Sequence, residues 1–216
     1  MRVVHVQLVP VESGAAEDPL LLAQLNDSDR ATISALGFAA DRDRAATARA
    51  AVRLELGRRL GMRPRLVPLL ASQCGPPAVR GTSIGISWSH SGDWVALALS
   101  STHAVGVDLE LVPARVPLKA LARIGVSSLE EFVTLEAAGK VSGDGLAAAW
   151  PSAVTARSFP APAGYLGAVA TSGDDWCVEM EPWGEEPPVS ASATAIGLWD
   201  VTGVGSRKLT YADVRT

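Results

Sequence analysis

The sequence predicts an α+β protein made of two similar lobes, each an antiparallel sheet with packed helices. Two observations lead to this fold class. Hydrophobic residues first recur with a helical period and then alternate as in strands, and this succession occurs twice along the chain. The chain has 216 residues, of which 48% are hydrophobic and 19% are charged, so it can bury the cores of two small lobes.

The first lobe is expected to begin with a strand and continue with helices. Residues 2–9 alternate in polarity, which is typical of a strand with one buried face. Asp27 or Ser28 is a suitable N-cap for the second helix, and Gly61 is a suitable end for the third. The predicted helices cover residues 20–26, 28–36 and 41–60.

The pattern then changes to strands. Gly92 and Asp93 form a good tight turn between two runs of β-prone residues, so a hairpin is expected there. The predicted strands cover residues 66–71, 83–91, 94–99 and 104–111. We expect the last three to form an antiparallel meander.

The second lobe repeats the order of helices followed by strands. Ser128 is a suitable N-cap, and Glu131 follows at the spacing of a capping box. Helices are expected over residues 117–124 and 128–141. Strands are expected over residues 153–159, 165–171 and 176–180.

These elements predict three parts of the chain. The N-terminal lobe takes residues 1–103, and the C-terminal lobe takes residues 104–182. Residues 183–216 are rich in Gly, Ser, Ala, Pro and Thr, so they form a C-terminal extension. This extension either adds one strand over residues 195–201 or stays partly disordered.

Charge and composition narrow the class of protein. The net charge of −4 and the pI near 5.4 give no general attraction to nucleic acid or to an anionic membrane. The sequence contains no apolar run of about 18 residues and does not start like a secretory signal, so we expect a cytoplasmic protein. Cys74 and Cys177 fit no metal-binding spacing and are expected to be free thiols.

Two carboxylates lie close together on a predicted strand. Asp108 and Glu110 are two residues apart, so both side chains leave the same face of that strand. Their adjacent negative charges call for compensation, and a hard divalent cation such as Mg2+ provides it through oxygen ligands. The alternative interpretation is a solvated strand face, which needs no metal.

Two further groups of residues favour a site. Glu136 and Lys140 lie four apart on a predicted helix and therefore share a face. Ser89 and His90 end a strand just before a tight turn, where a hydroxyl and an imidazole can reach a phosphate. Taken singly, the helix pair is an ordinary surface pair, and most lone histidines are structural.

Taken in order, three segments resemble the signature motifs of the Sfp-type 4'-phosphopantetheinyl transferases. They are residues 86–93 (ISWSHSGD), 105–110 (VGVDLE) and 132–140 (FVTLEAAGK). The resemblance also extends to the arginine-containing helix and to a late core strand, so that it covers about residues 25–172. It implies a pseudo-dimer of two α+β lobes in a single, monomeric chain.

The resemblance also implies an activity. Members of this family transfer the phosphopantetheine arm of coenzyme A to a serine of an acyl or peptidyl carrier protein, with Mg2+ bound at the pyrophosphate. Carried over to this sequence, the metal ligands are Asp108, Glu110 and Glu136. The implied catalytic residues are Glu136, Lys140 and His90, with Glu136 as the base for the carrier serine. The implied contacts to coenzyme A phosphates are Ser89, His90, Arg44, Arg49 and Arg53.

The sequence departs from the family pattern at two lysines. Pro76 and Leu135 stand where the family has lysines near the pyrophosphate, and Arg80 or Lys119 would have to compensate. One alternative is therefore a re-purposed homologue on the same fold that acts on or binds a small molecule of a secondary-metabolite pathway. Further alternatives are a cysteine hydrolase or cyclase using Cys74 with His90 as base, and an interaction module.

Overall fold

The structure is a computed structural model, and it describes residues 1–70, 76–143 and 153–183. The described helices are α1 (Pro19–Leu22), α2 (Asp27–Ser34), α3 (Ala39–Leu60), α4 (Leu118–Arg123) and α5 (Leu129–Ser142), with short 3-10 turns at Ala15–Glu17 and Pro64–Leu66. The described strands are β1 (Arg2–Pro10), β2 (Leu69–Leu70), β3 (Ala78–Val79), β4 (Gly85–Ser91), β5 (Trp94–Ser100), β6 (Val105–Leu111), β7 (Val154–Ser158), β8 (Tyr165–Ser172) and β9 (Trp176–Met180).

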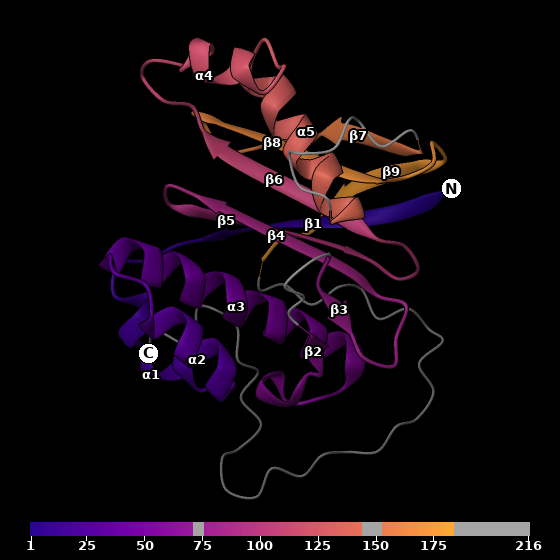
Figure 1. Cartoon of the computed structure of the whole chain (residues 1–216). Coiled ribbons are helices and arrows are strands. Elements are labelled where there is room, and N and C mark those ends of the chain that lie inside the picture. The colour runs from indigo at the N-terminus through magenta and orange to yellow at the C-terminus, as the bar shows by residue number, and fades with distance from the viewer. Residues whose placement is uncertain (71–75, 144–152, 184–216) are drawn as a thin grey trace, which may run out of the picture.

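The strands form two sheets that lie between helices (Figure 1). The larger sheet has the order β2-β3-β4-β5-β1-β9, and the smaller has the order β6-β8-β7. Helix α3 packs on the larger sheet, whereas α5 packs on the smaller one. The chain is therefore an α+β fold with packed helices, as the sequence predicts.

The pairing of the strands differs from the expected arrangement in two places. The β4–β5 hairpin is antiparallel as predicted, but β6 does not continue a meander, because it pairs with β8 in the smaller sheet. Strand β9 follows β8 in sequence but pairs with β1, in parallel. The smaller sheet is antiparallel, and the larger sheet is mixed rather than purely antiparallel.

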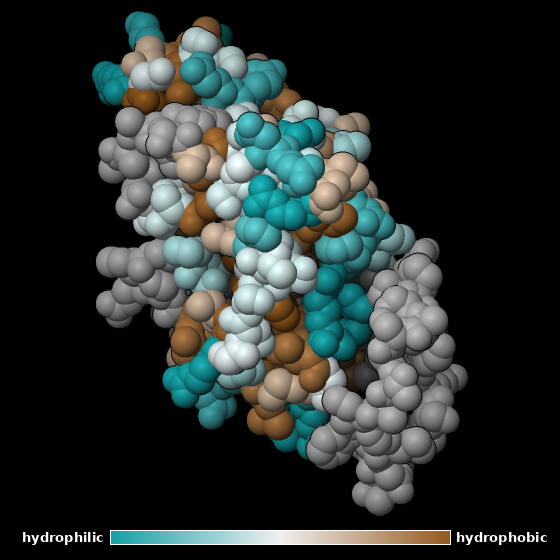
Figure 2. All heavy atoms as spheres, turned by 90° about the vertical axis from the view of Figure 1, so that its right-hand side faces the viewer, coloured by the Kyte–Doolittle hydropathy of each residue, from teal (hydrophilic) through white to brown (hydrophobic). Residues whose placement is uncertain are grey.

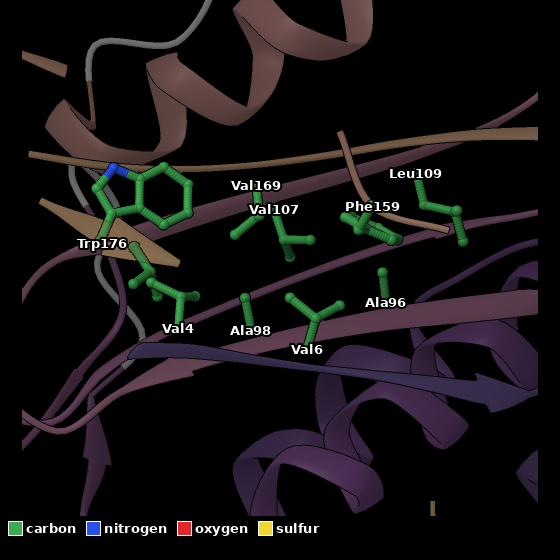
Figure 3. Packing of buried hydrophobic residues seen from close by; sticks show 10 residues of the cluster. Val4, Val6, Ala96, Ala98, Val107, Leu109, Phe159, Val169 and Trp176 are labelled. Carbon is green, nitrogen blue, oxygen red and sulfur yellow. The ribbon is translucent and has the colours of Figure 1, made fainter. Parts of the chain in front are cut away.

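A shared hydrophobic core lies between the two sheets (Figure 3). Alternate residues of β1 and β5 face alternate residues of β6 and β8 across this core, as the period of a strand requires. The buried side chains are Val4, Val6, Ala96, Ala98, Val105, Val107, Leu109, Phe159, Val169 and Trp176. Because Val107 and Leu109 point into this core, the residues between and after them point the other way.

Helix α3 is the longest described helix, and its ends follow local sequence signals. Gly61 takes a left-handed conformation at φ 63° and ends the helix, as predicted. One side of α3 packs Val52 and Leu56 against the larger sheet. The preceding helix α2 is capped by Asn26, not by Asp27 or Ser28, because the Asn26 side chain accepts the Asp29 N–H at 2.9 Å.

Helix α5 lies very close to β6, and a glycine makes this possible. A Cβ atom placed on Gly106 would lie 2.0 Å from the carbonyl oxygen of Ala137 on α5. Ser128 caps the helix by accepting the Glu131 N–H, as expected, and Gly143 ends it at φ 81°. The close approach brings the side chains of α5 next to the polar face of β6.

Some expected elements are shorter or fall outside the described residues. The predicted strand over residues 66–71 is reduced to Leu69–Leu70, because the prolines at 64 and 68 favour a 3-10 turn and an extended link before it. Cys74 and the possible strand at 195–201 lie outside the described residues. Cys177 is a free thiol.

The surface mixes polar and apolar side chains. The face seen in Figure 2 carries hydrophilic residues interspersed with smaller hydrophobic areas, as is usual for folded proteins. Within the described residues, no helix has both the length and the apolar character needed to cross a membrane.

Candidate functional site

The candidate site begins where β4 runs beside β6, at the junction of the two sheets. Ser87, Ser89 and Ser91 alternate along β4 and therefore share one face. All three hydroxyls reach β6, and the Ser87 Oγ accepts the N–H of Val107 at 3.1 Å. A row of serine hydroxyls thus joins two strands that belong to different sheets.

Asp108 is the most buried charged residue of this junction, with 2% of its surface exposed. Its Oδ1 accepts two hydrogen bonds, one from Ser89 Oγ at 2.7 Å and one from Lys140 Nζ at 2.7 Å. Lys140 also donates to the carbonyl oxygen of Val107 at 2.9 Å. The other carboxylate oxygen, Oδ2, is buried and has no hydrogen-bond partner among the residues that the structure describes. An unpaired buried carboxylate oxygen is costly unless a ligand compensates it.

Glu110 stands on the same face of β6, half-buried beside Ser91. Ser91 Oγ donates to Glu110 Oε2 at 2.9 Å and accepts the N–H of Leu111 at 3.0 Å. Burial raises the pKa of Glu110, the negative charges of Asp108 and Glu136 raise it further, and the hydrogen bond from Ser91 opposes the shift. The charge of Asp108 therefore adds to the effect of burial and disfavours the ionised form of Glu110.

Glu136 supplies a third carboxylate from α5. Burial raises its pKa, and the charge of Asp108 adds to this effect, while the ammonium of Lys140 opposes it. Among the residues that the structure describes, no three or more His, Cys, Asp or Glu side chains are already arranged as a metal-binding group. The chemistry of the residues nevertheless fits a hard cation, because it would pair with Asp108 Oδ2 and relieve the repulsion among the carboxylates.

A second, positive part of the site lies at the end of β4. Arg44 on α3 donates to the carbonyl oxygen of Gly92 at 3.3 Å and pairs with Asp41 at 2.5 Å. His90 is accessible to solvent, but partial desolvation lowers its pKa and the positive charges of Arg44 and Lys140 lower it further. An anion bound here would reverse this effect and favour protonated His90.

Two of the predicted phosphate contacts lie elsewhere. Arg53 is 2% exposed, pairs closely with Asp29, and donates to the carbonyl oxygen of Val67 at 3.1 Å. Arg49 also pairs with Asp29, at 2.9 Å. Both guanidinium groups therefore hold α2 against α3, and neither joins the group around Asp108.

Ser89 makes a contact that the sequence did not indicate. The sequence predicts that it contacts a phosphate, but its buried hydroxyl donates to Asp108 and orients that carboxylate. At the two positions without the expected lysines, Pro76 and Leu135 are both half-buried, whereas Arg80 and Lys119 are exposed. No contact of Arg80 or Lys119 with the site is found among the described residues.

The structure adds residues whose role the sequence does not indicate. Tyr165 on β8 reaches the turn of the β4–β5 hairpin, where its OH accepts the N–H of Asp93 at 2.9 Å. A Cβ atom at Gly92 would lie 2.2 Å from this OH, so the glycine is needed for the contact. Only the alternation of serines in residues 86–93 could have indicated Ser87 and Ser91, and no local signal indicates Tyr165.

Comparison with known proteins gives one significant similarity. A phosphopantetheinyl transferase from a Thraustochytrium species is 32% identical over 117 residues, a region that covers 53% of this chain and 38% of that protein. The matched region is thus well under half of the relative's length. No family model matches the chain. The similarity supports a divergent relationship to phosphopantetheinyl transferases, and the fold is compatible with it.

Proposed function

We propose that this protein transfers the 4'-phosphopantetheine arm of coenzyme A to a serine of an acyl or peptidyl carrier protein, with Mg2+. The observation that carries the proposal is the environment of Asp108. Its buried carboxylate is held by Ser89 and Lys140 and keeps one unpaired oxygen beside two carboxyl groups with raised pKa values. The similarity to a transferase supports the same activity.

In the proposed mechanism, Asp108, Glu110 and Glu136 would hold Mg2+, whose positive charge would offset the negative charge that develops on the pyrophosphate as the phosphoanhydride bond breaks. Arg44 and His90 bind phosphate groups of coenzyme A at the end of β4. Desolvation and Arg44 disfavour a charge on His90 in the free protein, so its protonation is coupled to the arrival of the phosphate anion.

In the proposed mechanism, Glu136 and Lys140 of α5 transfer the protons. Glu136 is the proposed base for the carrier serine, because it supplies a carboxylate from α5 beside Lys140 and Asp108. The ammonium of Lys140 uses two of its three N–H donors on Asp108 and Val107. Its third donor is available to stabilise or protonate the departing adenosine bisphosphate.

The proposal extends to the organisation and setting of the protein. The two sheets with their helices are proposed to correspond to the lobes of a pseudo-dimer, divided near residue 103, with residues 183–216 as an extension. One segment assigned to the second lobe, β9, pairs with β1 of the larger sheet, which ties the two parts together. We further propose a cytoplasmic monomer that serves secondary metabolism.

The second candidate function is that of a re-purposed homologue, which binds or acts on a small molecule but transfers no phosphopantetheine. The apolar Pro76 and Leu135 favour it, because two cations are missing where a pyrophosphate would need them. The cysteine hydrolase has no support in the described residues, because its nucleophile, Cys74, lies outside them.

A transfer assay separates these functions. The protein is incubated with coenzyme A, Mg2+ and several apo carrier proteins, and mass spectrometry follows the addition of one phosphopantetheine arm. We expect the addition with wild-type protein and a loss of at least about 100-fold in rate for Asp108→Asn. The control Asp174→Asn, an exposed carboxylate in the β8–β9 turn, should keep the wild-type rate. Folded protein that loads no carrier would contradict the transferase and favour the re-purposed homologue.

A further inference from the structure

We propose that Ser91 is a positioning residue that orients Glu110 for metal binding. This inference rests on the proposed function, because it concerns the same Mg2+ site. Ser91 lies at the end of β4, opposite the end of β6 where Glu110 stands. Ser91 makes no hydrogen bond to Asp108 or Glu136, so it acts on the proposed metal site through Glu110.

The hydrogen bonds of Ser91 have a defined direction. The backbone N–H of Leu111 can only donate, so the Ser91 Oγ must accept it at 3.0 Å. The single proton of the hydroxyl is then directed to Glu110 Oε2, 2.9 Å away, which as an ionised carboxylate can only accept. The serine thereby links the carboxylate of Glu110 to the backbone of the next residue and limits its rotation.

This link leaves a particular oxygen of Glu110 available. Oε2 is occupied by Ser91, and Oε1 accepts no hydrogen bond from the described part of the chain. Asp108 shows the same division, because its Oδ1 is occupied by Ser89 and Lys140 while Oδ2 has no partner in residues 1–70, 76–143 and 153–183. Two serines spaced two residues apart on β4 thus match two carboxylates with the same spacing on β6, and each carboxylate keeps one oxygen for a cation.

Ser87 on the same strand provides a matched control for Ser91. Ser87 lies on the same strand face, and it also accepts a backbone N–H of β6, from Val107 at 3.1 Å. It makes no hydrogen bond to a carboxylate of the site. Removing the Ser87 hydroxyl therefore tests the loss of a strand-to-strand hydrogen bond alone, whereas removing that of Ser91 also releases Glu110.

The test measures Mn2+ binding by electron paramagnetic resonance, with no coenzyme A or carrier protein present. Outer-shell partners of metal ligands typically change affinity by about 10–100-fold. We expect Ser91→Ala to weaken Mn2+ binding at least about tenfold, Ser91→Thr to restore it by keeping the hydroxyl, and Ser87→Ala to stay within about twofold of wild type. If Ser91→Ala does not fold, Ser91→Cys, a much weaker donor, takes its place with the same expectation.

Several outcomes would overturn the inference. Wild-type affinity in Ser91→Ala would show that Glu110 does not depend on the serine, and an equal loss in Ser87→Ala would show a merely structural role. A wild-type protein that binds no Mn2+ would contradict both the inference and the metal site. Wild-type protein that binds Mn2+ but loads no carrier would contradict only the transferase, so the two failures are distinguishable.

Discussion

Gly106 controls how closely α5 approaches β6, and Gly106→Ala tests this directly. The added Cβ would lie 2.0 Å from the Ala137 carbonyl oxygen and 3.0 Å from Lys140 Cβ. Ordinary contacts begin near 3.4 Å, so the helix would have to retreat by about 1.4 Å. The nearest atom belongs to helix backbone, which cannot rotate away as a side chain can.

The displacement should lower both stability and activity. Overpacking of this kind costs about 1–3 kcal/mol of unfolding free energy, which corresponds to a fall of about 2–12 °C in Tm for a protein of this size. Movement of α5 also breaks the 2.7 Å contact between Lys140 and Asp108. Since a misplacement of about 1 Å at a catalytic group can cost about 100-fold in rate, we expect a comparable loss in the transfer assay.

Thermal unfolding and the transfer assay check the two effects separately. Gly37→Ala is the matched control, because a Cβ at Gly37 meets nothing within 4 Å and the backbone there is not in the left-handed region. It should keep both the Tm and the rate of the wild type. A Gly106→Ala protein that behaved like this control would show that α5 tolerates the methyl group without moving.

Two further predictions concern stability away from the metal ligands. Burial alone would raise the pKa of Glu55, but its bonds from Arg58 and Arg59 outweigh this and leave the pKa lowered. The stabilisation by ionised Glu55 is therefore present above the ordinary pKa of a glutamate and is lost as the pH falls through the lowered pKa of the folded protein. In urea unfolding, Glu55→Gln should lower the free energy of unfolding by about 1–3 kcal/mol at pH 7 and by clearly less near pH 3. Equal losses at both pH values would contradict this. Tyr165→Phe removes the acceptor of the Asp93 N–H and should cost about 1 kcal/mol in the same measurement, and an unchanged midpoint would show that the contact contributes nothing.

The elements that the sequence predicts well are those with local signals. Helices α3 and α5 end at Gly61 and Gly143, where a left-handed residue is needed, and α5 starts at Ser128, whose side chain caps it. Pairing of strands has no such signal. Alternation along β6 and β9 shows which residues share a face, but not that their partners are β8 and β1.

The site shows the same difference between what local spacing predicts and what only the tertiary packing shows. The shared face of Asp108 and Glu110 follows from spacing alone, as does that of Glu136 and Lys140. Spacing does not show which of Arg44, Arg49 and Arg53, the α3 arginines expected to contact phosphate, reach the site. Arg49 and Arg53 meet Asp29, which lies on α2 and about twenty residues earlier in the chain, so only the tertiary packing reveals that they stabilise the fold.

The missing lysines matter because the remaining cations of the site already have partners. Lys140 is engaged by Asp108 and Val107, and Arg44 is engaged by Asp41 and Gly92. Neither can move toward the positions of Pro76 or Leu135 without giving up these bonds, and breaking the bond to Asp108 leaves a buried charge unpaired. A transferase with this site must therefore rely more heavily on the carboxylate-bound cation than a relative that keeps both lysines, and the orientation of those carboxylates by the β4 serines becomes correspondingly more important.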